Sequence, residues 1–469
     1  MLAKNLEFEH RGEDRKHHGH SWREILRTFI SSVTFAAIFP VGLAAQAPSP
    51  AAGASTQAAG YGTGAQTPLQ FAGESAPTNQ VSLGMGVSAF YDDDVQATNT
   101  QRLGDEAVSF TSSLGIARQT QNVTINFNYT PFFMLYRRFD QYDRLNHAAN
   151  LGMTYRLTSR FIVGLHGTFS YQNGVYPGLT GEQILSGSAS PTALNQMIYS
   201  YTTRTLSTMA GLNLTFVKSQ RTSLTFSGGY TQYKFGGQTV AGQPLYNGSG
   251  LNGSMQFKYR VTEHTNFGIL LLHQDSTYQG GELFGYRQRA QVESTFLSVG
   301  SRLSPTITAT VFGGPQYVHT LGQSSPGSSI AGSLQAAGGG SITKEVRKTA
   351  LNLALQRSVS DGGGIYTSVI NNYATFGVRR RLGGRWEAGI SGGAARADTS
   401  LFQLANNRTD SLTGGIDFSR PLREGSIFHI SYNTFHQLSK GALPISTDFD
   451  RNQVTIGVDF QLKAIPIGR

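Results

Sequence analysis

Residues 123–129 read VTINFNY, a stretch in which apolar and polar side chains alternate at every position. In an extended strand, this alternation puts the apolar side chains on one face and the polar ones on the other. The same period of two recurs from Val81 nearly to the C-terminus, most clearly in residues 81–87, 108–116, 145–157, 161–171, 251–259, 428–432 and 454–462. The stretch 145–157 exceeds the about 9–11 residues that a tilted strand needs to cross a membrane. The pattern therefore predicts an all-β chain of long membrane-spanning strands.

The connections between these stretches are of two kinds that take turns along the chain. Short ones lie at residues 119–121, 158–160, 218–220, 262–264, 304–305, 345–347, 383–384 and 422–425. Long ones lie at residues 92–104, 137–144, 174–199, 236–247, 276–285, 321–330, 358–365, 398–406 and 438–448. This alternation predicts a transmembrane antiparallel up-and-down β-barrel of about 18 strands over residues 80–469, with both termini in the periplasm. The number falls to about 16 strands if residues 331–345 and 349–357 form one irregular segment.

The composition agrees with a barrel and excludes several other classes of protein. Only 14% of the 469 residues are charged, while there are 56 glycines, 28 phenylalanines and 20 tyrosines. A soluble chain usually carries about 25% charged residues. A helical membrane protein would be more apolar than the mean hydropathy of −0.23 indicates. The absence of cysteine excludes disulfides, thiolate metal ligands, a cysteine nucleophile and a lipid-anchored N-terminal cysteine.

The net charge of +10 does not indicate a nucleic-acid partner. Proteins that bind nucleic acid gather their basic residues into patches. Here, apart from Arg379-Arg380-Arg381, the basic residues beyond the N-terminal segment form no block and are scattered singly or in pairs. We therefore expect them to line a pore or to face anionic lipopolysaccharide, and we expect no nucleic acid to bind.

The N-terminal segment has the order that marks a secretory signal. Basic residues flank the start of the apolar run 25–45, and small residues follow it. This order predicts a signal peptide over residues 1–47, cleaved after Ala44 or after Ala47, and an uncleaved inner-membrane anchor is the alternative. Residues 48–79 are rich in Ala, Gly, Gln and Pro, which predicts a flexible linker. This linker is too short to hold the plug domain of a TonB-dependent transporter.

The last strand carries a pattern typical of outer-membrane barrels. Thr455, Gly457, Phe460 and Leu462 follow a polar-x-Gly-x-x-aromatic-x-apolar order. This order resembles the signal by which the barrel-assembly machinery recognises final strands, although the usual signal ends on a terminal aromatic residue and here residues 463–469 follow. The resemblance implies that this machinery is a partner of the chain.

Three segments together resemble a known family. Residues 84–95 read GMGVSAFYDDDV, and VTINFNY at 123–129 precedes NHAANLGMTYRL at 146–157. This succession resembles the β-barrel porin 2 family of outer-membrane proteins over about residues 80–469. In that family an asparagine follows the acidic residues that end the first strand, whereas this chain has Asp94. The resemblance implies an outer-membrane barrel, with polysaccharide-export components as partners.

Several charged residues are expected to line the lumen because they alternate with apolar positions. They are Lys258, Arg260, Arg287, Arg289, Glu293, Arg379, Arg381, Arg385 and Glu387. Rings of Arg and Lys select anions, and a mixed Arg/Glu wall creates a transverse field. A water-filled barrel would also line its wall with polar groups that have no selective role. The long connection 174–199 either folds inward as a constriction or covers the mouth.

Two groups of residues suggest chemistry but do not establish it. The acidic stretch 92–94, with Asp105 and Glu106, offers oxygen ligands for Ca²⁺, although an acidic surface loop explains it equally. His429 and Ser431 have the His-x-Ser spacing of outer-membrane phospholipases, but the alternation turns both side chains toward the lumen rather than toward lipid. We therefore expect no enzyme activity, no metal and no cofactor.

These observations predict a porin-like outer-membrane channel for hydrophilic solutes. The family resemblance implies, as a second reading, a barrel involved in polysaccharide export. The alternative is a structural or interaction barrel, with long loops that bind envelope partners around a blocked lumen.

Overall fold

A computed structural model describes residues 79–96, 102–173, 204–236, 247–279, 287–322, 331–362, 366–398, 408–423, 425–440 and 448–467. The strands are β1 (Gln80–Asp92), β2 (Asp105–Gln119), β3 (Val123–Tyr136), β4 (Arg144–Arg156), β5 (Phe161–Asn173), β6 (Arg204–Val217), β7 (Thr222–Gly236), β8 (Asn247–Arg260), β9 (Thr265–Gln279), β10 (Arg287–Ser304), β11 (Ile307–Gly322), β12 (Ala331–Val346), β13 (Thr349–Gly362), β14 (Tyr366–Arg381), β15 (Glu387–Asp398), β16 (Arg408–Arg423), β17 (Ser426–Lys440), β18 (Phe449–Gln461) and the short β19 (Ile465–Pro466). Two 3₁₀ turns, η1 (Asp140–Tyr142) and η2 (Gly383–Arg385), accompany them. Within these ranges, no helix is long and apolar enough to cross a membrane.

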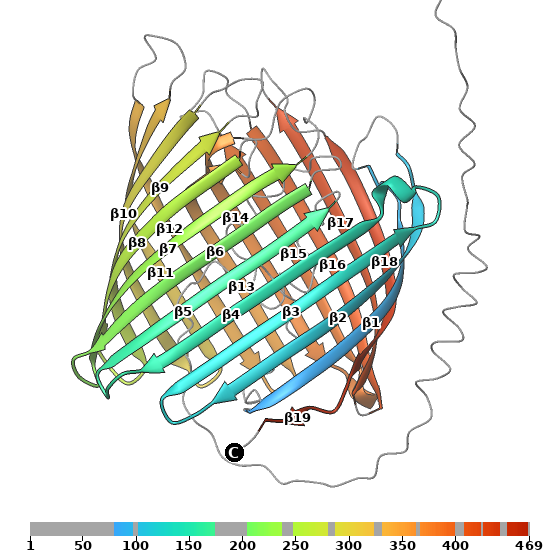
Figure 1. Cartoon of the computed structure of the whole chain (residues 1–469), viewed down its shortest axis with the longest axis horizontal. Coiled ribbons are helices and arrows are strands. Elements are labelled where there is room, and N and C mark those ends of the chain that lie inside the picture. The colour runs from blue at the N-terminus through green and yellow to red at the C-terminus, as the bar shows by residue number, and fades with distance from the viewer. Residues whose placement is uncertain are drawn as a thin grey trace, which may run out of the picture. The chain divides into compact units, whose positions relative to one another are not determined.

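The sheet closes on itself to form a barrel (Figure 1). Each of the strands β1 to β17 pairs antiparallel with the next one along the chain, and β18 pairs with β1 from Gly84↔Gln461 to Asp92↔Gln453. The short β19 lies beside the start of β1, where Ile465 pairs with Val81. The prediction of a closed antiparallel barrel of 18 strands is thus confirmed. The 16-strand alternative is wrong, because β12 and β13 are separate strands that pair with each other.

One end of the barrel carries the short turns, and we call it the short-turn end. Left-handed backbone occurs in these turns at Gly384 (φ 70°) and Gly425 (φ 76°), which glycine adopts without a steric penalty. Asn79 accepts a hydrogen bond from the backbone N–H of Ile467 at 2.8 Å, so both described chain ends lie at this end. The opposite end carries the long connections and is called the long-loop end. The predicted signal peptide (1–47) and nearly all of the linker (48–79) lie outside the described residues.

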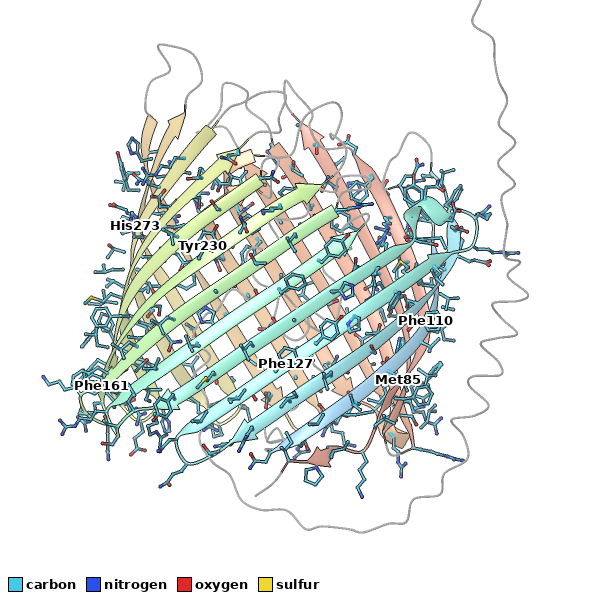
Figure 2. All side chains as sticks on the ribbon, in the orientation of Figure 1. Met85, Phe110, Phe127, Phe161, Tyr230 and His273 are labelled. Carbon is cyan, nitrogen blue, oxygen red and sulfur yellow. The ribbon has the colours of Figure 1, made fainter. Side chains whose placement is uncertain are left out.

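The outward face of the strands carries apolar side chains that are unfavourable in water. Leu251, Leu303, Val311 and Leu334 are 62%, 65%, 63% and 71% exposed. Met85, Phe127 and Tyr230 lie on the same face (Figure 2). Soluble proteins rarely expose a continuous apolar area above a few hundred Å². A closed sheet with such a band is stable in hydrocarbon because every strand is paired, so the barrel is suited to span a membrane.

Aromatic side chains gather on the outward face near the short-turn end. The rings of Phe161 and Phe216 lie 4.9 Å apart between centroids, and Trp386 meets Phe428 edge to face. The guanidinium of Arg420 lies 5.4 Å from the Trp386 ring centroid. Aromatic rings and arginines in this position are typical of the boundary between hydrocarbon and water.

Candidate functional site on the inner wall of the barrel

The inner wall consists of the side chains that alternate with the outward apolar ones and face the lumen. On β8, Leu251, Met255 and Tyr259 are exposed on the outward face, so Lys258 and Arg260 belong to the inner wall at the short-turn end. The structure thus places these two predicted residues on the expected face. Two neighbouring cations make this part of the inner wall positively charged.

A second charged group lies on the inner wall of β14, β15 and β16. Arg381 pairs with Glu387, with 3.2 Å between Nε and Oε1. Arg379 is 9% exposed and lies in register with Asp417 across Gly389. Arg379, Arg381 and Glu387 therefore lie on the face that the sequence predicted, and each cation has a carboxylate beside it.

The structure corrects the predicted orientation of the charged residues of β10. Arg289 and Glu293 share a face with the exposed Leu297 and Val299, so they point outward, near the long-loop end. Arg289 forms an ion pair with Asp275 on this outward face. Glu293 Oε1 lies 3.6 Å from Nδ1 of His273, which Figure 2 labels.

The error in β10 has a physical cause. An apolar residue between charged ones indicates the lipid-facing side of a strand, whereas Val292 is 6% exposed and packs inside the barrel. Arg287 is in β10 opposite Gln279, but its side chain lies outside the described part of the chain. Arg385 belongs to the turn η2, with φ 71°, rather than to the wall.

Part of β13 and β14 folds into the lumen near the long-loop end. Val359 shares a face of β13 with the outward Leu353 and Leu355, yet it forms a buried cluster with Val318, an inner-wall residue of β11. The backbone N–H of Val359 also donates to Gln316 Oε1 at 2.9 Å. The outward face of this hairpin therefore packs against the inward face of β10 and β11, and the hairpin occupies part of the lumen.

Glycines allow this change of layer. β12 pairs with β11 from Ala331 to Lys344, but with β13 only from Gly338 to Val346. A Cβ at Gly339 would lie 2.4 Å from the carbonyl oxygen of Leu355. Such a distance is too short for any side chain, so a glycine is required where β13 leaves the neighbouring strand.

The seam between β1 and β18 carries a buried ion pair at the long-loop end. Arg451 Nε lies 3.0 Å from both carboxylate oxygens of Asp92, and the two side chains are 4% and 0% exposed. Gln453 Nε2 donates to the same carboxylate at 2.8 Å. The neighbouring Asp93 accepts from Asn452 N–H and from Asn452 Nδ2. These contacts join the first and last long strands.

An aromatic cluster lies on the inner wall beside this seam. Phe90 and Tyr136 meet edge to face at 5.9 Å, and Tyr142 of η1 packs on Tyr136. Arg144 Nη2 donates to the Tyr136 hydroxyl at 3.1 Å. Burial raises the pKa of the Asp143 carboxyl, which accepts from the Tyr136 backbone N–H at 2.7 Å.

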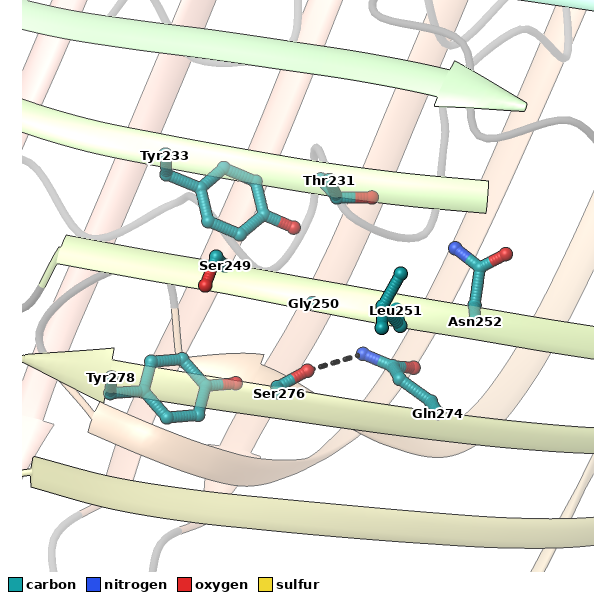
Figure 3. A pocket seen from close by; sticks show the side chains of 9 residues that line it. All are labelled: Thr231, Tyr233, Ser249, Gly250, Leu251, Asn252, Gln274, Ser276 and Tyr278. Carbon is teal, nitrogen blue, oxygen red and sulfur yellow. Dashed lines mark hydrogen bonds between the residues drawn. The ribbon is translucent and has the colours of Figure 1, made fainter. Parts of the chain in front are cut away.

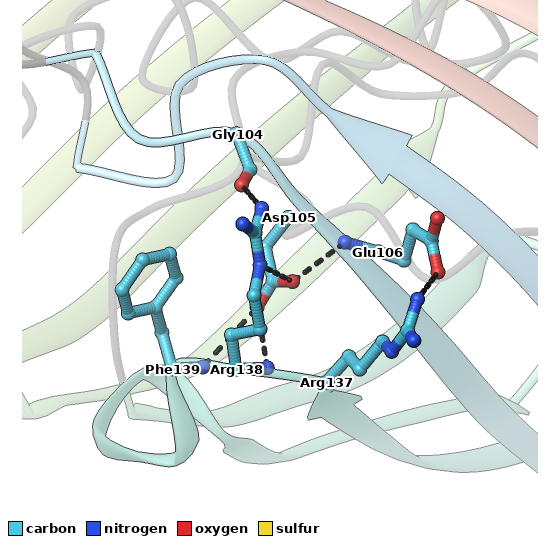
Figure 4. Close-up of polar contacts among 6 residues, drawn as sticks. All are labelled: Gly104, Asp105, Glu106, Arg137, Arg138 and Phe139. Carbon is cyan, nitrogen blue, oxygen red and sulfur yellow. Dashed lines mark hydrogen bonds and ion pairs between the residues drawn. The ribbon is translucent and has the colours of Figure 1, made fainter.

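The carboxylate of Asp105 organises the connection between β3 and β4 (Figure 4). It accepts from the backbone N–H groups of Glu106, Arg138 and Phe139 at 2.9, 2.9 and 3.2 Å. Glu106 pairs with Arg137 at 2.9 Å. These acidic side chains bind protein donors, and among the described residues no group of three or more His, Asp or Glu is placed to hold a metal ion. The calcium interpretation of the acidic stretch therefore has no structural support.

A polar pocket on the inner walls of β7, β8 and β9 was not predicted from the sequence (Figure 3). Tyr233 and Tyr278 stand on either side of β8, close to Gly248, where a Cβ would lie 3.1 and 3.4 Å from their rings. Thr231, Asn252, Gln274 and Ser276 complete the lining, and Gln274 Nε2 donates to Ser276 Oγ at 3.1 Å. The lining combines aromatic rings with amides and hydroxyls and includes no charged side chain. The sequence feature that could have indicated this pocket is the pair Thr231 and Tyr233, which lies on the face of β7 opposite to that of Tyr230.

The predicted assembly signal lies on β18 and just after it. Thr455 and Gly457 belong to the inner wall, while Phe460 and Leu462 are 46% and 49% exposed. The backbone N–H of Leu462 donates to the carbonyl of Leu83 at 2.8 Å, so the end of the signal lies against β1. Recognition by the assembly machinery stays a prediction. The connection 174–199 lies outside the described residues.

No known family profile and no curated protein sequence matches the chain. Solved structures with a similar fold include OccK2 (OpdF) of Pseudomonas aeruginosa in complex with glucuronate, which is 12% identical, with 82% of this chain and 98% of that chain covered and a TM-score of 0.42. The outer membrane protein opdK of the same organism is 12% identical, with 82% and 100% covered and a TM-score of 0.41. The ferric citrate transporter FecA is 8% identical, with 83% and 79% covered and a TM-score of 0.45. At these values the likeness is one of general architecture only.

Proposed function

We propose that the protein is an outer-membrane channel that lets hydrophilic solutes diffuse across a Gram-negative-type envelope. The observation that carries this proposal is the closed barrel of 18 strands, with an apolar outer band and a largely polar inner wall. Barrels of about 16–18 strands are wide enough for an aqueous channel. The inward-folded part of β13 and β14 narrows this channel near the long-loop end.

The location and the partners belong to the same proposal. The predicted secretory signal delivers the chain to the periplasm, and the short turns face the periplasm, as in other bacterial barrels. The barrel-assembly machinery inserts the chain, and the outer band contacts lipid and lipopolysaccharide. Membership of the β-barrel porin 2 family, and a link to polysaccharide export, stay predictions of the sequence.

The charges of the inner wall predict a preference for anions. Lys258 and Arg260 are adjacent inner-wall cations, whereas Arg381 has Glu387 as a partner. We expect the purified barrel to conduct ions in a planar bilayer and to show an anion-selective reversal potential in a salt gradient. In the variant Lys258→Gln/Arg260→Gln, this potential should shift toward cation selectivity while the barrel still conducts.

Arg289 provides the matched control, because it is basic but points outward. Arg289→Gln should leave the reversal potential unchanged. A barrel that is folded but does not conduct would contradict the channel and favour the alternative, a structural barrel that binds envelope partners through its loops.

A carbohydrate cargo is a second, narrower candidate, and the pocket of Tyr233 and Tyr278 favours it. Aromatic rings stack on the apolar faces of sugars, while amides and hydroxyls pair with sugar hydroxyl groups. A neutral oligosaccharide such as maltohexaose should interrupt the current, and Tyr278→Ala should shorten these interruptions severalfold. Equal interruptions in both proteins would exclude the pocket as a sugar site.

A further inference from the structure

Three side chains from three strands meet on the inner wall across the seam of the barrel. They are Ser88 of β1, His429 of β17 and Asp459 of β18. Ser88 Oγ lies 3.2 Å from His429 Nε2, and Asp459 Oδ2 lies 3.1 Å from His429 Nδ1. The imidazole thus bridges a hydroxyl and a carboxylate through its two nitrogens. This is the arrangement of a serine nucleophile, a base and an orienting acid.

Two glycines make room for the group. Gly457 lies in register between Ser88 and His429, and a Cβ there would lie 2.2 Å from Ser88 Oγ and 2.6 Å from His429 Nε2. A Cβ at Gly86 would lie 2.2 Å from Asp459 Oδ1. A Cβ at position 457 would therefore stand between Ser88 and His429. The contact between Ser88 and His429 depends on glycine at position 457.

The group is accessible from the lumen. The side chains of His429 and Asp459 are 26% and 56% exposed, and Ser88 is half-buried. A solute in the channel can therefore reach the hydroxyl. The charge of Asp459 orients the Nδ1–H of the imidazole, which leaves Nε2 as the acceptor for the Ser88 hydroxyl proton.

We propose that Ser88, His429 and Asp459 form a nucleophilic site that hydrolyses short O-acyl esters of hydrophilic molecules in the lumen. Ser88 Oγ attacks the ester carbonyl and forms a bond to its carbon, while its proton moves to His429 Nε2. The carbon–oxygen bond to the alcohol breaks, and His429 returns the proton to the leaving alcohol. Water then attacks the acyl-serine, with His429 again taking and returning a proton, and releases the carboxylic acid.

The surroundings indicate the class of substrate. The cross-strand neighbours of Ser88 and Gly86 on β2 are Ser109 and Thr111, which are small and polar. Such neighbours suit a short acyl group on a hydrophilic molecule, rather than a fatty acyl chain. Most strand amides serve the ladder, so the hydroxyls of Thr455 and Ser431, one row closer to the long-loop end, are placed to stabilise the oxyanion.

The test uses the full-length barrel refolded in detergent, with a fluorophosphonate as covalent probe and p-nitrophenyl acetate as substrate. We expect the probe to add once, at Ser88, and ester hydrolysis to acylate the same residue, both read by peptide mass spectrometry. Ser88→Ala should abolish labelling. His429→Gln should lower the rates of labelling and hydrolysis by about 100-fold or more, because general-base catalysis typically contributes about 10²–10⁴-fold.

Ser82→Ala is the matched control, since Ser82 is a half-buried inner-wall serine of the same strand, and its hydroxyl donates to the carbonyl of Gly115 rather than to a histidine. This variant should keep full labelling. Heat-modifiable gel mobility shows that each variant is folded. Asp459→Asn is a second test variant, and it should lower the rates of labelling and hydrolysis less than His429→Gln does. A wild-type barrel that is not labelled, or labelling that persists in Ser88→Ala, would overturn the site. Ser88→Ala should still conduct ions, so this test is independent of the channel.

Discussion

Asp92 and Arg451 show how single residues hold the barrel closed. The sequence placed Asp92 in an acidic stretch that resembled a calcium site or a surface loop, and nothing near it indicated a partner. Its partner lies 359 positions away in the chain and meets it only when β18 pairs with β1. Short-range patterns cannot predict such a contact, because it depends on closure of the whole sheet.

Asp92→Asn should destabilise the barrel strongly, since it removes the carboxylate charge that pairs with the buried Arg451. We expect a loss of about 3–5 kcal/mol in the free energy of unfolding, measured by urea titration of the barrel in lipid vesicles. Asp275→Asn, which breaks the more exposed pair with Arg289, should cost only about 0–1 kcal/mol. If both variants lost the same free energy of unfolding, the ion pair at the seam would contribute no more to stability than the exposed pair.

The same limit applies to the group of Ser88, His429 and Asp459, because it too depends on how distant strands pair. The alternation correctly turned His429 toward the lumen, and on that ground the sequence predicted no catalysis with Ser431. The serine that approaches His429 is instead 341 positions earlier in the chain. The pairing register determines this partner, and the register could not be read from one strand alone.

At the scale of the element, the strands were predicted well where one face is lipid and the other is water. On β8 the alternation placed Lys258 and Arg260 on the correct face. On β10 it failed, because an inward hairpin buries Val292 and thereby makes an inner-wall position apolar. The pattern of apolar and polar residues reflects what each face of the strand contacts. On the inner face of β10 the contact is with protein rather than with water.

The hairpin of β13 and β14 should control the width of the channel. Val359→Asp places a charge in its contact with Val318, so we expect the hairpin to detach and single-channel conductance to rise. Val359→Ala keeps the contact apolar and should conduct like the wild type. Unchanged conductance in Val359→Asp, with the barrel still folded, would show that the hairpin does not limit the current.

At the scale of the whole molecule, the architecture followed from a feature that survives local errors. Short and long connections alternate along the chain, and this alternation predicted 18 strands even though the parity of β10 was misread. The inward fold of β13 and β14 and the Tyr233–Tyr278 pocket were not predictable in this way. They depend on how strands separated along the chain stack within one closed wall.

Closure should be all-or-none at this scale. A chain that ends at residue 447 lacks β18 and leaves the edges of β1 and β17 unpaired, and open edges do not persist in hydrocarbon. We expect this chain to show no heat-modifiable species on a gel. A chain that ends at residue 464 lacks only β19, and we expect it to show the heat-modifiable species. A compact, heat-modifiable truncated barrel would contradict the requirement for the seam.

The seam also determines when the protein can become active. Because β1 pairs with β18 as well as with β2, one edge of the first strand to emerge during export stays unpaired until the last strand arrives, and the loop that must close spans nearly the whole barrel. Folding is therefore expected to be slow and to end with this step. Until then Ser88 lies on one side of the unclosed gap, and His429 and Asp459 lie on the other. An unassembled chain in the periplasm would thus carry no functional ester-cleaving group, and assembly itself would switch the activity on.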